Sequence, residues 1–313
     1  MTWLKRISIA VFIIFILSFF IPIQTTTKGI IKRTFYDIVV EINNPDSWKK
    51  WFEPIKSSYQ KKPKSFRFEE NYKNKNFTIY TQNNKYTVTK YSPGTIKIED
   101  NAFLNTTHDV SITLSTTGNS VIYETYSTSL LNFMISYFNK PRFSVTNNLK
   151  NFMETPSLYY GFQINRTAVP DTSYIVNTQT SLLKNRYKIT DSLYKSLREF
   201  AIKNKILKSF NPYLVTNTIG KDSIKIMAML VVDNNKEYYG KISSFIMPKS
   251  GNMLSAKFKG NYGESKKVYD ALLKYVFDNS LSSVFTPFER YVDNKVPKND
   301  SSKVDIEVFY PIY

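Results

Sequence analysis

The sequence of 313 residues contains no cysteine, and histidine occurs once, as His108. Without cysteine the chain has no disulfide, no thiolate nucleophile, no lipoprotein anchor and no cysteine-based zinc site. A single histidine excludes a multi-histidine metal site, and a Ser-His-Asp triad would depend on this one residue. His108 lies in the polar run "NTTHDV", which favours a loop or the end of a strand. We therefore expect no metal site and no cofactor.

Acidic residues are also few: 25 Asp and Glu stand against 43 Lys and Arg, a formal net charge of +18. Such an excess is typical of nucleic-acid binding. The lysines are, however, interleaved with asparagine and tyrosine along the chain, with no arginine-rich run, zinc-finger pattern or RNA-binding aromatic motif. An AT-rich genome gives the same composition, and a basic surface also suits an anionic membrane. We expect no nucleic-acid partner.

One long hydrophobic run stands near the N-terminus, from Ile7 to Ile23, interrupted only by two serines. At helical rise this run reaches about 25 Å, the short end of the length needed to span a bilayer. The bulky residues before "QTTT" make a poor signal-peptidase site. The pattern predicts an uncleaved single-pass transmembrane helix in residues 1–29 and a location at the cell membrane. Positive residues flank the run on both sides and favour neither orientation.

The segment after this run predicts a strand and then short helices. Phe35–Ile42 is rich in β-branched and aromatic residues, which favours a strand. Asn44 can cap a helix whose first position is Pro45. Trp48 and Trp51 are three residues apart and fall on one face of that helix.

Alternating strand patterns follow, separated by turn signals such as "SPG" and "TTGNS". The block closes with "NNLKNFMETP", in which Leu149, Phe152 and Met153 recur at helical spacing. The expected strands are "SFRFEENY", "NFTIYTQNN", "KYTVTKYSPG", "TIKIED", "DVSITLSTTGNS" and "VIYETYS".

This order, together with "NNPDSWKKWFEPI", resembles the START-like superfamily, of the SRPBCC or polyketide cyclase type. The resemblance covers about residues 35–155. It implies a helix-grip fold, in which a curved sheet wraps a long C-terminal helix and leaves an apolar cavity between them. In the alternative, the aromatic side chains fill the core and leave no usable cavity.

The second half contains an internal repeat with an offset of 75 residues. Each copy predicts a strand, an amphipathic helix and two further strands, and two such units would pair into one sheet that carries two helices. The matched pairs are Lys184 and Lys259, Tyr187 and Tyr262, Tyr194 and Tyr269, Leu197 and Leu272, Asn204 and Asn279, Phe210 and Phe285, and Pro212 and Pro287.

The repeat also isolates one acid, Glu289, in the aromatic stretch "FTPFERYVDN". Its counterpart in the first copy is Leu214, so the fold itself accepts an aliphatic residue at this position. Strand alternation places Glu289 and Tyr291 on the same face. A semi-buried anion needs a partner, and a cationic ligand would provide one. Nearby aromatic rings would add cation–π attraction of up to about 2 kcal/mol.

The two-copy unit, with "KGNYGES", "FERYVDN" and "DIEVFYPI", resembles the GyrI-like domain, also called the AraC effector-binding domain, over about residues 170–313. The resemblance implies a groove between the repeats for small cationic or aromatic molecules, with Glu289 as the characteristic contact. Some members of this bacterial family instead hydrolyse cyclopropane compounds with a glutamate. Tyr262 and Tyr291 match the motifs as pocket aromatics, and Phe245 and Met247 come from the strand that opens the second copy. No helix-turn-helix pattern precedes the domain.

The sequence thus predicts an α+β protein with a transmembrane anchor at residues 1–29, a START-like domain at 30–160 and a pseudo-two-fold GyrI-like domain at 161–313. The leading hypothesis is a membrane-anchored binding protein for a small hydrophobic or cationic ligand. One alternative is a hydrolase of small electrophilic compounds that uses Glu289, so whether the protein is an enzyme stays open. The other is a non-catalytic structural protein of the envelope.

Overall fold

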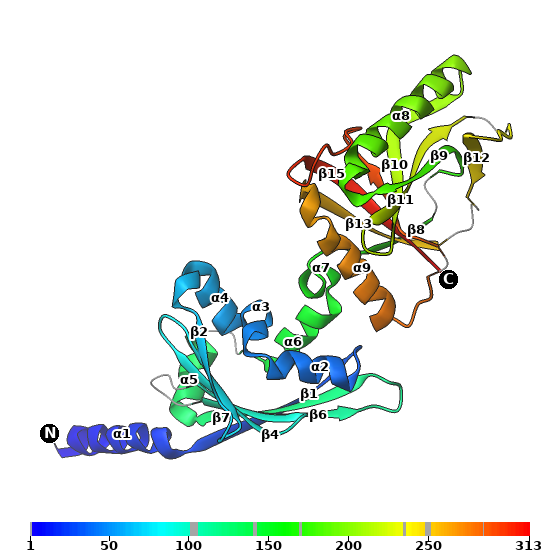
Figure 1. Ribbon diagram of the computed structural model, residues 1–313. Coiled ribbons are helices and arrows are strands. Elements are labelled where there is room, and N and C mark those ends of the chain that lie inside the picture. Colours follow the sequence, from blue (N-terminus) through cyan, green and yellow to red (C-terminus); the bar gives the residue numbers. More distant parts are fainter. Residues whose placement is uncertain are drawn as a thin grey trace. The chain divides into compact units, whose positions relative to one another are not determined.

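The computed structural model describes residues 2–100, 106–139, 143–168, 171–233, 236–247, 252–283 and 285–313. The chain divides into two compact units, Met1–Tyr159 and Tyr160–Tyr313. Each unit contains an antiparallel sheet with helices packed on it (Figure 1). The α+β class expected from the sequence is therefore confirmed.

The first unit is built on a sheet with the strand order β1-β7-β6-β5-β4-β3-β2. Its strands are β1 (Pro22–Ile31), β2 (Arg67–Asn71), β3 (Asn76–Tyr80), β4 (Lys85–Ser92), β5 (Thr95–Asp100), β6 (Thr106–Leu114) and β7 (Ser120–Ser129). Its helices are α1 (Thr2–Phe20), α2 (Phe35–Asn43), α3 (Trp48–Trp51), α4 (Glu53–Lys61), α5 (Leu130–Asn139), α6 (Val145–Glu154) and α7 (Pro156–Tyr159), with 3-10 turns η1 (Pro45–Ser47) and η2 (Pro63–Ser65). The expected strands from β2 to β7 and the closing helix α6 are confirmed.

The N-terminal segment differs from the expected transmembrane anchor. Helix α1 ends at Phe20, and strand β1 begins at Pro22 and pairs with β7 along its whole length. The apolar run that ends at Ile23 is therefore divided between a helix and an edge strand of the sheet. Within the ranges described above, no helix is both long enough and apolar enough to cross a membrane. The prediction of a transmembrane helix in residues 1–29 is corrected accordingly, and the membrane location that depended on it has no support.

Phe35–Ile42 forms helix α2 rather than the expected strand. Thr34 caps it: the Thr34 hydroxyl accepts a hydrogen bond from the Asp37 backbone N–H at 3.2 Å and donates to the Asp37 carboxylate at 2.7 Å. Ile38 and Ile42, four residues apart, are both fully buried. The cap and this spacing outweigh the β-branched composition, because together they satisfy the first turn and bury one helical face.

Aromatic side chains fill the core of the first unit. Trp48 and Trp51 are buried, and the ring centroid of Trp48 lies 4.6 Å from that of Trp51 and 5.8 Å from that of Phe77 on the sheet. The same buried cluster includes Leu149 and Phe152 of α6. Side chains from α3, the sheet and α6 thus share one buried cluster.

A buried carboxylate fixes the start of α6. Glu124 on β7 is 2% exposed, and its oxygens accept hydrogen bonds from the backbone N–H groups of Val145 and Thr146, both at 2.9 Å, and from the Ser144 hydroxyl at 2.8 Å. His108 Nδ1 lies 2.8 Å from Glu124 Oε1. Burial raises the pKa of Glu124, but the hydrogen bonds from His108, the backbone and Ser144 lower it by more than burial raises it. The resulting pKa is about 2, below the usual 4.5. His108 is thus buried near the start of strand β6, so of the two expected positions the structure shows the strand end and not the loop.

The second unit has one sheet with the order β12-β9-β11-β10-β14-β15-β13-β8. Its strands are β8 (Asn165–Ala168), β9 (Ser173–Leu182), β10 (Leu207–Ile219), β11 (Ser223–Val232), β12 (Ile242–Ile246), β13 (Asn252–Asn261), β14 (Phe288–Tyr291) and β15 (Lys303–Ile312). Its helices are α8 (Arg186–Lys203) and α9 (Lys266–Asp278), preceded by the 3-10 turns η3 (Leu183–Asn185) and η4 (Tyr262–Glu264).

The strand order shows the internal repeat directly. One copy is β9-α8-β10-β11, the other is β13-α9-β14-β15, and the two meet where β10 pairs with β14. Helix α8 packs on the strands of the first copy and α9 on β13 and β15 of the second (Figure 1). Two strand-helix-strand-strand units in one sheet with two helices are therefore confirmed.

Candidate functional site

The repeat equivalents Leu214 and Glu289 lie directly opposite each other in the sheet. Strands β10 and β14 are antiparallel, and their register pairs Leu214 with Glu289 and Tyr213 with Arg290. Because Leu214 and Glu289 also correspond under the 75-residue offset, the pseudo-two-fold axis passes between them. The single acid therefore breaks the symmetry at the centre of the unit.

Three tyrosine hydroxyls hold the Glu289 carboxylate, which is 2% exposed. Tyr262 donates to Glu289 Oε1 at 2.8 Å, and Tyr291 donates to the same oxygen. Tyr269 donates to Glu289 Oε2 at 3.1 Å. Tyr291 follows Glu289 by two residues on β14, Tyr269 lies on α9 and Tyr262 begins the turn η4. Strand alternation, the helix and the turn thus converge on one acid.

The electrostatics of this cluster are unusual because all the donors are neutral. Burial raises the pKa of Glu289, although the hydrogen bonds from Tyr291, Tyr262 and Tyr269 oppose this rise. Burial, and next the charge of Glu289, raise the pKa of each of these tyrosines, so they stay protonated and act as donors. Among the described residues, no Lys, Arg or His forms an ion pair with Glu289. In the part of the chain that the structure describes, the site is a buried acid without a counter-cation.

The outer part of the cluster also lies on the pseudo-two-fold axis. Tyr187 and Tyr262 are repeat equivalents, and their rings contact each other with centroids 6.1 Å apart at 69°. The Tyr187 hydroxyl donates to Asp300 Oδ1 at 2.8 Å, and Asp300 also pairs with Arg186. Tyr187 and Tyr262 are half-buried, whereas Glu289 is buried. The pair of rings therefore forms the side of the cluster nearer to solvent.

The structure brings Tyr262 and Tyr291 to Glu289, but it places Phe245 and Met247 elsewhere. Phe245 on β12 and Met247 pack in a cluster with Phe288. Phe288 directly precedes Glu289 in β14, so its side chain lies on the opposite face of the sheet. Phe245 and Met247 are thus separated from the acid by the sheet itself.

Sequence reasoning missed the contact of Tyr269. The repeat pairs it with Tyr194, whose hydroxyl donates to the backbone carbonyl of Tyr213 instead. Both copies have a tyrosine at this position, so the repeat alone does not show that the Tyr269 hydroxyl donates to the Glu289 carboxylate. A usable signal was that the acid occurs in the same copy as Tyr269, whose helix α9 packs on β13 and β15 of that copy.

Comparisons with known proteins return solved structures only. No family model matches the sequence, and no curated protein matches it. The chain is similar to an EcmrR–DNA complex determined by cryo-EM (18% identity, 48% of this chain, 57% of that chain, TM-score 0.40). It is also similar to the EcmrR C-terminal domain (17% identity, 49% and 98% covered, TM-score 0.40) and to an integron cassette protein of Vibrio cholerae (13% identity, 49% and 97% covered, TM-score 0.27). At these scores the similarity assigns no function, and the site is interpreted from its own geometry.

Proposed function

We propose that the second unit is a small-molecule binding module that takes a cationic aromatic ligand at Glu289. The observation that carries this proposal is a buried carboxylate that is held by three neutral tyrosine hydroxyls and, among the described residues, by no cation. An ionised carboxylate out of water is costly unless a cation compensates it. A ligand cation supplies that charge, and the surrounding phenol rings attract it further.

Entry of the ligand requires the outer rings to move. Tyr262 is held by its hydrogen bond to Glu289 and by its ring contact with Tyr187, both of which a cation with aromatic rings can replace. Tyr262 lies on the short turn η4, whereas Tyr291 lies inside a paired strand. We expect Tyr262 and Tyr187 to swing aside and Glu289 with Tyr291 to stay in place. This mode of binding agrees with the GyrI-like resemblance of the sequence.

We also infer that the first unit belongs to the START-like type. Its support is the element order: one strand, helical segments, six further strands and a closing helix. The first of these strands is Pro22–Ile31, which pairs with the last strand, β7, as the helix-grip layout requires.

A hydrolase is a second candidate, because burial raises the pKa of Glu289 toward the range that suits a general acid or base. Turnover of a cyclopropane compound by the wild type, lost in Glu289→Gln, would establish it. Undiminished turnover in that variant would remove Glu289 from the chemistry.

The binding proposal is tested by calorimetric titration with two ions of the same shape and opposite charge, tetraphenylphosphonium and tetraphenylborate. We expect the cation to bind and the anion not to bind. Glu289→Gln should weaken the cation by about tenfold or more, since it removes a desolvated charge pair. Glu264→Gln is the matched control, because Glu264 is an exposed acid in the same turn as Tyr262. Equal binding by wild type and Glu289→Gln would contradict the proposal.

A further inference from the structure

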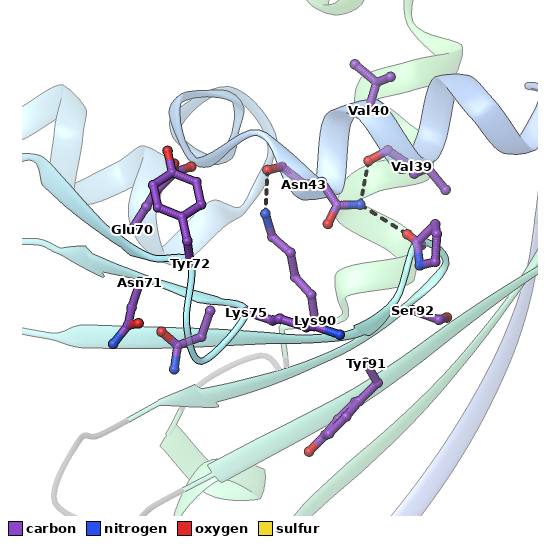
Figure 2. A pocket seen from close by; sticks show the side chains of 12 residues that line it. Val39, Val40, Asn43, Glu70, Asn71, Tyr72, Lys75, Lys90, Tyr91 and Ser92 are labelled. Carbon is purple, nitrogen blue, oxygen red and sulfur yellow. Dashed lines mark hydrogen bonds between the residues drawn. The ribbon is translucent and has the colours of Figure 1, made fainter.

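The first unit contains a cleft of about 600 Å³ that is independent of Glu289 (Figure 2). This volume falls within the range of small-molecule sites. Its walls come from the C-terminal half of α2, the turn between β2 and β3, and the end of β4 with the residues that follow. The lining residues include Val39, Val40, Asn43, Lys75, Lys90 and Tyr91.

Lys90 is one of the two cationic side chains that line this cleft. Its side chain is half-buried, and its Nζ donates to the Asn43 backbone carbonyl at 3.3 Å and lies 5.0 Å from the ring centroid of Phe77. Within the described ranges, no carboxylate forms an ion pair with Lys90. An ammonium group has three N–H donors, so a single carbonyl leaves donors for a further acceptor.

A second cation, Lys75, is fixed beside Lys90 by the backbone. The Lys90 N–H donates to the Lys75 carbonyl at 2.9 Å. Lys75 has a φ of 50°, in the left-handed region that non-glycine residues seldom adopt. The turn is held by the Lys75 N–H, which donates to the Tyr72 carbonyl at 3.3 Å. Figure 2 shows both lysine side chains in the cleft.

The rest of the lining is uncharged apart from Glu70. Glu70, the acid of the cleft, accepts a hydrogen bond from the Tyr72 hydroxyl. The Asn43 side chain donates to the carbonyls of Val39 at 2.8 Å and Pro93 at 3.0 Å, which ties α2 to the β4–β5 turn. The cleft therefore has a cationic end and an apolar wall.

We propose that this cleft binds a small organic carboxylate with a planar apolar body. The carboxylate lies on the ammonium groups of Lys90 and Lys75, and the apolar body lies against Val40, Pro93 and the ring of Tyr91. The chain thus carries two sites of opposite preference, an anion site in the first unit and the proposed cation site at Glu289. The net charge of +18 raises the local concentration of anions around the protein.

The test is a calorimetric titration of the full chain with 1-naphthoate, neutral 1-naphthamide and cationic 1-naphthylmethylammonium. Lys90→Met and Lys75→Met remove the two cations. Lys75 is exposed, so its loss leaves the core intact even if Lys90→Met disturbs the packing on Phe77. Lys73→Met is the matched control: it removes the same charge from the same turn, at an exposed residue outside the lining.

We expect 1-naphthoate to bind at least about tenfold more tightly than the amide and the amine. Each of Lys90→Met and Lys75→Met should weaken 1-naphthoate, the former by about tenfold, whereas Lys73→Met and Glu289→Gln should leave it unchanged. The proposal is overturned if 1-naphthoate does not bind, or if Lys73→Met weakens it as much as the two cleft variants do. Because Glu289→Gln reports only on the second unit, failure of one site is distinguished from failure of the other.

Discussion

At the scale of single residues, Glu289 lowers the stability of the free protein at neutral pH. Its pKa is raised by burial, so the folded state binds a proton more tightly than the unfolded state does. The resulting loss of stability is absent at pH values below the pKa of Glu289 in the unfolded chain. It grows as the pH rises toward and through the pKa of Glu289 in the folded protein. The cluster thus keeps an acid that the fold does not need, since Leu214 serves in its place in the other copy.

We predict that Glu289→Gln raises the free energy of unfolding at pH 7 by about 1–3 kcal/mol. The amide keeps an oxygen for Tyr262 and Tyr291, and its NH₂ can donate to the Tyr269 hydroxyl, so the loss of charge is the main change. Urea unfolding between about pH 4 and pH 8 measures the effect, and the gain should shrink toward the acid end. A variant less stable than wild type at pH 7 would show that the carboxylate stabilises the free fold.

At the scale of elements, the buried carboxylate of Glu124 attaches α6 to the sheet. The pKa of Glu124 is lowered from 4.5 to about 2 by folding. Its contribution to the free energy of unfolding is therefore present above its pKa in the unfolded chain and is lost as the pH falls through its pKa in the folded protein. This shift corresponds to stabilisation on the order of 3 kcal/mol.

We therefore predict that Glu124→Gln destabilises the protein by a few kcal/mol at pH 7 and removes much of its acid sensitivity between about pH 5 and pH 2. Unfolding followed by tryptophan fluorescence reports on the first unit, where Trp48 and Trp51 are buried. Glu99→Gln, at an acid on β5 of the same sheet that pairs with Lys97, is the control and should change stability by less than about 1 kcal/mol. Equal effects of the two substitutions would count against the helix anchor.

Strand β1 and helix α6 approach each other closely at Gly29. A Cβ built on Gly29 would lie 2.3 Å from the Thr146 Cγ2 methyl, which is closer than any tolerable contact. We predict that Gly29→Ala destabilises the fold by about 1–3 kcal/mol through overpacking. Thr146→Ser removes that methyl, so the double variant should recover most of the loss in a denaturant titration. If the double variant is no more stable than Gly29→Ala alone, the close approach is not the cause.

Most elements could be predicted from the sequence, and the misses have local causes. Alternation and turn residues give the strands of the first unit, and the 75-residue repeat gives the second. Helix α2 forms where a strand was expected because the Thr34–Asp37 cap and the Ile38–Ile42 spacing outweigh the β-branched composition. Strand β1 overlaps only the last residues of the apolar run and continues through "QTTTKG", and its pairing with β7 is a long-range contact that no local pattern shows.

The candidate site could be predicted only in part, for a similar reason. The asymmetry of the repeat identified Glu289, and the matched motifs identified Tyr262 and Tyr291. Tyr269 required knowledge of how α9 packs on its sheet. Phe245 was expected near the acid because the sequence does not show which face of the sheet its side chain occupies.

At the scale of the whole molecule, we propose two domains that fold on their own. Each unit has its own sheet, and separate buried clusters serve the two sheets. Tyr160 already belongs to the second unit, where its hydroxyl donates to Asp278 at 2.9 Å. We predict that a fragment of residues 160–313 unfolds cooperatively and binds tetraphenylphosphonium as the full chain does. A fragment that is unfolded by circular dichroism would contradict independent folding.

The central claim, that Glu289 receives a cationic ligand, is tested most directly by the pH dependence of binding. A protonated carboxyl gains no charge attraction, so a cation favours the ionised form and competes with the proton. The dissociation constant of tetraphenylphosphonium should therefore be measured between about pH 5 and pH 8 for wild type and Glu289→Gln. We predict that wild-type affinity rises with pH and then levels off, while the variant binds weakly and without pH dependence. A variant that follows the same curve as the wild type would contradict the claim, because the affinity would then not depend on the charge of Glu289.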